Sequence, residues 1–168
     1  MSTDDTASLP FVEEYGPAWV PGPFERGTDG PQLILAGVDG SPTALRAGAY
    51  AAGLARRQRS RLVVVYVLSP SAWTGMSPSL LAAAQEQAHS DMIDELRRPI
   101  QNLAAEAHIS ITLEVRRGDA YTELKRVAVT RQADLVVVGA SESAGHRLVG
   151  SVATRLVRAG LWPVTVVP

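Results

Sequence analysis

The sequence contains no cysteine, a single lysine and few aromatic residues. Without cysteine the protein has no disulfide bonds, no thiolate metal ligands and no thiol nucleophile. Aromatic residues make up 5% of the chain while 46% of it is hydrophobic, so the core must consist mainly of Val, Leu, Ile and Ala. The 168 residues predict one domain, stabilised by the packing of aliphatic side chains.

The chain also lacks any apolar run near the roughly 18 residues that a membrane span requires. Its first residues carry acids rather than the basic residues of an export signal. The net charge of −1 at pH 7 favours neither nucleic acid nor an anionic membrane as a partner. These absences predict a cytoplasmic protein with no membrane partner and no nucleic-acid partner.

The first 31 residues differ in composition from the rest. Their prolines and glycines, without a sustained period of two or 3.6, predict an irregular arm over residues 1–31 and a domain over residues 32–168. Residues 1–30 hold six acidic residues and one arginine, a charge of −5, which leaves about +4 for the remainder of the chain. Two alternatives stay open, a mobile leader or an arm that docks on the domain or a partner through its apolar residues, Phe11, Tyr15, Trp19, Val20 and Phe24.

From residue 33 onward, β-branched runs alternate with segments whose apolar residues recur at helical spacing. The pattern predicts strands at 33–38, 62–68, 109–115, 134–139 and 163–167, and helices at 43–59, 79–107, 120–131 and 151–158. Strands without polar alternation need both faces covered, which predicts an α/β fold with a parallel five-stranded sheet between two helical layers. Ligands of such doubly wound sheets bind beside the carboxyl ends of the strands, where the winding direction reverses.

The loop after the first strand, Asp39-Gly40-Ser41-Pro42, is the first candidate site. Ser41 suits the N-cap and Pro42 the first helical position, which leaves Asp39 at the tip of the strand. The carboxylate of Asp39 could accept hydrogen bonds from a ribose hydroxyl or an adenine amino group. It could equally accept the backbone N–H groups of the turn, so both interpretations stay open.

The loop after the fourth strand runs from Gly139 to Gly150 and Ser151, where a helix begins. Glycine lets the backbone approach a ligand closely, and N–H groups at a helix start carry partial positive charge. Gly150 and Ser151 could therefore hold a phosphate, although Ser151 could instead serve only as a helix cap.

Several segments together resemble the universal stress protein family over residues 33–168: VDGSP, LVVVYV, the Arg-Gly-Asp turn at 117–119, VVVG, GSVATRLV and PVTVVP. The resemblance implies a Rossmann-like three-layer fold with strand order 3-2-1-4-5, in which the tips of the first and fourth strands are neighbours. It also implies a stress-response domain that binds an adenine nucleotide, ATP or AMP, with or without magnesium, and that pairs into a homodimer through its last strand. That strand is apolar and would otherwise be an exposed edge of the sheet.

Carried over position by position, the nucleotide site of the family falls on Asp39, Gly40, Ser41, Val67, Gly139, Gly150, Ser151 and Val152. The sequence departs from the family pattern after the fourth strand, where Glu142 replaces a glycine and the loop is two residues short. A carboxylate beside a phosphate weakens binding, whereas Arg147 could neutralise Glu142 or pair with the phosphate. An alternative therefore stays open, an interaction module that has lost nucleotide binding and engages a partner through the arm.

No pattern in the sequence predicts catalysis. His89, His108 and His146 form no metal-binding constellation, and Lys125 lies in a predicted helix rather than in a phosphate loop. We therefore predict a non-enzymatic protein with no catalytic residues and no metal site. An arginine cluster near the end of the first helix, Arg56, Arg57, Arg59 and Arg61, fits a solvated helix end better than a nucleic-acid patch.

Overall fold

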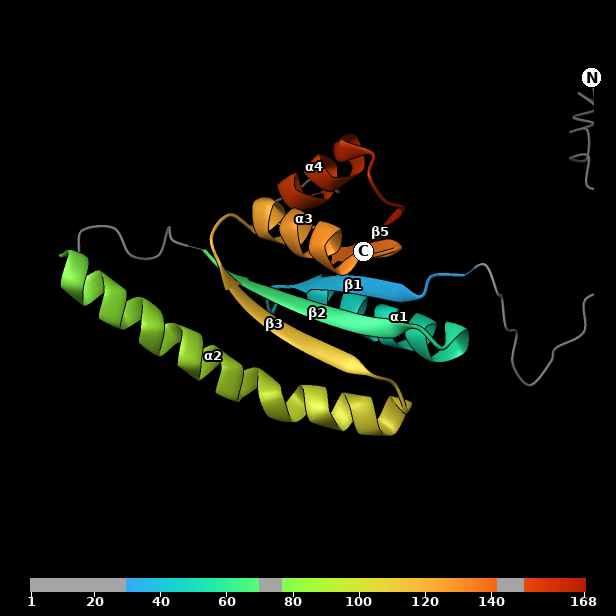
Figure 1. The fold of residues 1–168 in the computed structure, drawn as a ribbon, viewed down its shortest axis with the longest axis horizontal. Helices are drawn as coiled ribbons and strands as arrows, with labels where there is room; N and C mark the ends of the chain where they lie inside the picture. The colour runs from blue at the N-terminus through green and yellow to red at the C-terminus, as the bar shows by residue number, and fades with distance from the viewer. Residues whose placement is uncertain (1–29, 70–76, 142–149) are drawn as a thin grey trace, which may run out of the picture.

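The structure is a computed structural model that describes residues 30–69, 77–141 and 150–168 (Figure 1). In chain order its elements are β1 (Leu33–Val38), α1 (Pro42–Gln58), β2 (Arg61–Leu68), α2 (Pro78–Ala107), β3 (Ile111–Arg117), α3 (Ala120–Arg131), β4 (Leu135–Gly139), α4 (Ser151–Ala159) and β5 (Val164–Val167). Each predicted strand and helix is present. The predicted arm, except for its last two residues, lies outside the described residues, so the boundary at residue 31 stays a prediction.

The five strands form one parallel sheet in the order β3-β2-β1-β4-β5. The predicted fold class and strand order are thereby confirmed. The winding direction reverses between β1 and β4, which pair in register so that Gly37 lies opposite Val138. The carboxyl ends of these two strands are therefore neighbours, at the position where doubly wound sheets bind ligands.

Helices cover both faces of the sheet, with α1 and α2 on one side and α3 and α4 on the other (Figure 1). Successive side chains of β1 alternate between the two layers, so that Leu35 packs with α3 and α4 while Ile34 packs with α1. Both side chains are fully buried. Because both faces of the central strands are covered, their sequences read as continuous apolar runs.

Helix α1 begins as the sequence predicts. The backbone N–H of Ala44 donates to Oγ of Ser41 at 3.2 Å, and Pro42 is the first helical residue. The buried face of the helix consists mainly of alanine, which lets the helix axis lie close to the sheet.

Strand β3 departs from its predicted range, since it spans residues 111–117 rather than 109–115. Its last two residues, Arg116 and Arg117, continue the ladder opposite Val67 and Leu68 of β2. Two adjacent arginines are typical of a turn, but an edge strand can hold them because one side of the strand faces solvent. Among the described residues, no helix is both long enough and apolar enough to cross a membrane.

Candidate functional site

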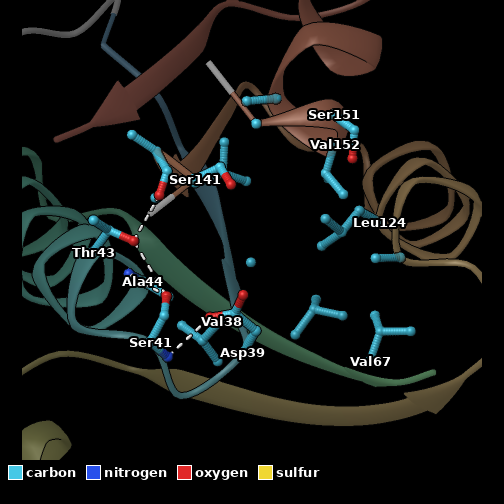
Figure 2. Close-up of a pocket in the computed structure, with 18 residues that line it drawn as sticks. Val38, Asp39, Ser41, Thr43, Ala44, Val67, Leu124, Ser141, Ser151 and Val152 are labelled. Carbon is cyan, nitrogen blue, oxygen red and sulfur yellow. Dashed lines mark hydrogen bonds between the residues drawn. The ribbon is translucent and has the colours of Figure 1, made fainter. Parts of the chain in front are cut away.

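A cavity of about 240 Å³ lies at the point where the winding direction reverses (Figure 2). Its wall includes seven of the eight residues predicted for the nucleotide site: Asp39, Ser41, Val67, Gly139, Gly150, Ser151 and Val152. The eighth, Gly40, is not among the lining residues and holds the turn after β1 with φ +83°. This left-handed conformation favours glycine. The structure therefore brings together the two loops that the sequence singled out, which come from opposite ends of the domain sequence.

Part of the apolar cavity wall was not predicted. Val65 of β2, Val138 of β4 and Leu124 of α3 line it beside the predicted Val67. Leu124 comes from a helix that carries no motif, and only the packing of α3 on the sheet brings it to the cavity. On β2 and β4, these valines alternate with residues that face α1. This period of two is the sequence signal by which they could have been found.

Asp39 lies exposed at the rim of the cavity. Its Oδ1 accepts a hydrogen bond from the backbone N–H of Ser41 at 2.9 Å, so this oxygen stabilises the turn. Oδ2 has no hydrogen-bond partner among the described residues. The carboxylate thus performs the structural role and still offers one acceptor to a ligand. The negative charge of Asp39 also acts on Tyr66. Burial is the main cause that raises the pKa of the Tyr66 phenol, and the nearby charges of Asp39 and Glu95 raise it further.

Thr43 connects the two loops. Its buried hydroxyl donates to the backbone carbonyl of Ala140 at 2.7 Å, and it lies 3.2 Å from Oγ of Ser41 (Figure 2). The start of α1 is therefore tied to the exit of β4 across 97 positions of sequence. Thr43 is not among the predicted site residues, because in the sequence it reads as an ordinary residue of the first helical turn.

Gly139 and Gly150 have packing roles that do not require a ligand. A Cβ atom on Gly139 would lie 2.6 Å from the backbone nitrogen of Ala44, so only glycine lets β4 end this close to α1. A Cβ atom on Gly150 would lie 2.9 Å from Cβ of Ser141. The glycines therefore shape the cavity, whichever ligand occupies it.

The N-terminus of α4 forms one side of the cavity. Gly150 is the N-cap and Ser151 is the first helical residue, so the alternative in which Ser151 caps the helix is wrong. The first helical hydrogen bond is donated by Thr154 to Gly150, at 2.9 Å. The preceding N–H groups have no partner within the helix, as at any helix start, and they carry the positive end of the helix dipole.

Asp119 and Arg155 link α3 to α4 beside the cavity. Asp119 caps α3 by accepting hydrogen bonds from the hydroxyl of Thr122 at 2.6 Å and from its backbone N–H at 3.0 Å. Arg155 donates to the same carboxylate at 3.1 Å and stacks on the ring of Tyr121, 4.1 Å from its centroid. The Thr122 hydroxyl, Arg155 and the Thr122 N–H together hold the pKa of Asp119 at about 2.

Among the described lining residues, Asp39 is the only charged side chain. Glu142 and Arg147, on which the sequence-based argument about phosphate depends, lie outside the described residues, as does His146. Within the described ranges, no group of three or more His, Asp or Glu side chains could hold a metal ion.

Comparison with known proteins gives concordant matches. The model of the universal stress protein family matches residues 31–168. A universal stress protein of Methanocaldococcus jannaschii is 26% identical over 136 residues, which is 80% of each chain. The structure of the universal stress protein UspA of Lactobacillus plantarum is 26% identical with a TM-score of 0.70, over 82% of this chain and 97% of that one. A universal stress protein solved in complex with cAMP is 25% identical with a TM-score of 0.60, over 82% and 96% of the two chains.

Proposed function

Because this chain belongs to the universal stress protein family, we propose that the cavity between β1, β4 and α4 binds an adenine nucleotide, AMP or ATP, without catalysing its conversion. One observation carries the proposal. The rim of Asp39, the apolar wall with Val67 and the N-terminus of α4 surround a single cavity at the point where the winding direction reverses. The complex of a related protein with cAMP supports the choice of an adenine nucleotide.

Each part of the cavity suits a different part of such a ligand. The free acceptor of Asp39 can bind a ribose hydroxyl or the adenine amino group, and the valines offer a flat base an apolar contact. The N–H groups at the start of α4 can bind a phosphate through their partial positive charge. In Figure 2, Asp39 and Ser151 lie on opposite sides of the cavity, so one ligand can contact both.

Calorimetric titration with AMP and ATP, with and without magnesium, tests this proposal. We expect binding to weaken about 10- to 100-fold in Asp39→Ala, because a hydrogen bond to a charged group contributes about 1.5–3 kcal/mol. Asp91→Ala is the matched control, since it removes the same charge from an exposed position of α2. Equal affinities of the two variants and the wild-type protein, or no binding by the wild-type protein, would overturn the proposal.

A second variant should fill the cavity rather than change its charge. Val67→Phe adds a ring to a partly buried position of the wall, and we expect it to exclude the base and abolish binding. Gly150→Val is less informative, because its Cβ atom would already collide with Ser141 in the ligand-free protein. Thermal unfolding of each variant distinguishes a filled cavity from a misfolded protein.

A non-enzymatic role, a homodimer formed through β5 and a cytoplasmic location complete the proposal. Steady release of phosphate from ATP that disappears in Asp39→Ala would contradict the non-enzymatic role.

A second candidate function is the interaction module that has lost nucleotide binding. Asp39, the only charged side chain among the described lining residues, is acidic and so does not attract a phosphate. In the sequence, Glu142 stands where the family pattern has a glycine. Both features favour this second function. Absence of binding at millimolar nucleotide, unchanged by Glu142→Gly, would select it.

A further inference from the structure

Four exposed arginines lie at the end of α1 and the start of β2, and we call Arg56, Arg57, Arg59 and Arg61 the arginine patch. None of their side chains makes a hydrogen bond or an ion pair with a described residue. Six other arginines of the described chain are ion-paired, whereas the patch gathers four that are not. Helix α1 contains no acidic residue that could balance it.

The N-terminal arm enters the domain directly beside the arginine patch. The hydroxyl of Ser60 donates to the carbonyl of Pro31, and the backbone N–H of Arg61 donates to the carbonyl of Gln32 at 2.9 Å. On the other side, the carboxylate of Asp134 accepts the N–H groups of Gln32 at 2.9 Å and Leu33 at 3.0 Å. The entry point of the arm is therefore fixed, and β1 starts at the end of the sheet where α1 ends (Figure 1).

The charge of the arm complements that of the patch. Residues 1–29 hold six acidic residues against Arg26 alone. Asp29 directly precedes Gly30, and Glu25 stands five residues before it, within about 18 Å of Gly30 even in a fully extended chain. A tether this short gives the two groups a high effective concentration for each other.

We propose that the acidic arm docks on the arginine patch of its own chain and screens it from other polyanions. The arm acts as an intramolecular counterion, and the patch binds an external polyanion only when the arm is displaced. The apolar residues of the arm can then contact the outer face of α1, where Tyr50 is exposed. This inference concerns the end of the domain opposite the nucleotide cavity and does not depend on the proposed function.

The absence of cysteine permits a direct test in the full-length chain. A nitroxide attached to Thr6→Cys lies 24 residues before Gly30, about 27 Å away on average if the arm were a random coil. We expect the label to broaden the amide signals of residues 56–61 at low salt. We expect the broadening to disappear at 1 M salt, where the Debye length is about 3 Å. Broadening that ignores salt, or that falls on other residues, would overturn the proposal.

Retention on a heparin resin tests the screening. The arm variant neutralises four acidic residues of the arm: E13Q, E14Q, E25Q and D29N. A control variant neutralises four exposed acidic residues of α2: D91N, D94N, E95Q and E106Q. The patch variant combines the arm substitutions with R56Q, R57Q, R59Q and R61Q.

We expect the arm variant to elute at higher salt than the wild-type protein and than the α2 control, which has the same net charge. The patch variant should lose the added retention, because the polyanion then has no arginine patch to bind. Equal retention of the arm variant and the α2 control would show an effect of net charge alone and would overturn the proposal. Strong retention of the wild-type protein would also overturn it, because the patch would then be open to an external partner.

Discussion

Gly139 shows how one backbone contact shapes both candidate loops. The missing Cβ atom lets the last residue of β4 lie against the first turn of α1, where Thr43 and Ala44 would otherwise collide with it. Thr43 then reaches the carbonyl of Ala140, and the two loops become one rim. The glycine that the family resemblance assigns to the nucleotide site therefore also serves the close packing of β4 on α1.

Gly139→Ala should destabilise the protein. The added methyl group must displace backbone atoms of α1, and overpacking of this kind costs about 1–3 kcal/mol. Gly53→Ala is the matched control, since a Cβ atom there meets nothing within 4 Å and the residue lies inside α1. It should stabilise the protein by about 0.5–1 kcal/mol. Urea unfolding measures both changes, and a Gly139→Ala variant as stable as the wild-type protein would contradict the packing role.

At the scale of elements, the helices α3 and α4 are joined by the contacts of Asp119 and Arg155. Asp119 caps one helix and is ion-paired to the other, while Leu124 and Val152 of the same helices line the cavity. The relative position of the two helices therefore sets the width of the cavity on this side.

The pKa of Asp119 makes this link sensitive to acid. Its carboxyl group has a pKa of about 2 in the folded protein and about 3.9 in an unfolded chain. Because the folded value is the lower one, the stabilisation is complete above about pH 4 and is lost as pH falls through about 2. We expect Asp119→Asn to lower the melting temperature at pH 7 and to melt together with the wild-type protein near pH 2. A constant difference in melting temperature over this range would contradict the prediction.

The two edge strands of the sheet differ in chemistry. On β3, Glu114 is ion-paired to Arg116 and to Arg131 of α3. Burial raises the pKa of Glu114, but its hydrogen bonds to the two arginines outweigh this effect and lower the pKa overall. Such charges protect an edge from pairing with another strand. Strand β5 carries Val164–Val167 instead, and Leu161 beside it is 53% exposed.

At the scale of the whole molecule, this difference favours β5 as the strand that pairs two copies. The carbonyl of Pro163 accepts a hydrogen bond from Val136 of β4, and that of Val167 accepts one from Ala140, directly after β4. The alternation of a parallel ladder therefore directs the backbone groups of Val164 and Val166 toward the free edge. The side chain of Val166 packs on the core, so its replacement by a charged residue would also disturb the fold.

Val166→Pro should convert the proposed dimer into a monomer. Proline removes the outward N–H group and leaves the bonds to β4 intact, a position at which edge strands tolerate it. Val166→Ala keeps the N–H group and should remain dimeric. Light scattering after gel filtration measures the mass of each variant, and equal masses for Val166→Pro and the wild-type protein would exclude pairing through this edge.

Local patterns in the sequence determined the elements and the fold class, because strands buried on both faces and alanine-rich helices leave a record in the residues themselves. The turn chemistry of Ser41 and Pro42 and the choice of the two loops were likewise readable, and the strand order followed from family resemblance. Only the tertiary structure decided that Gly139 serves packing, that Ser151 follows the helix cap, and that Leu124 lines the cavity. These facts depend on contacts between residues far apart in the chain, such as the hydrogen bond from Thr43 to Ala140 across 97 positions. Such contacts arise from the packing of helices on the sheet, which no local pattern encodes.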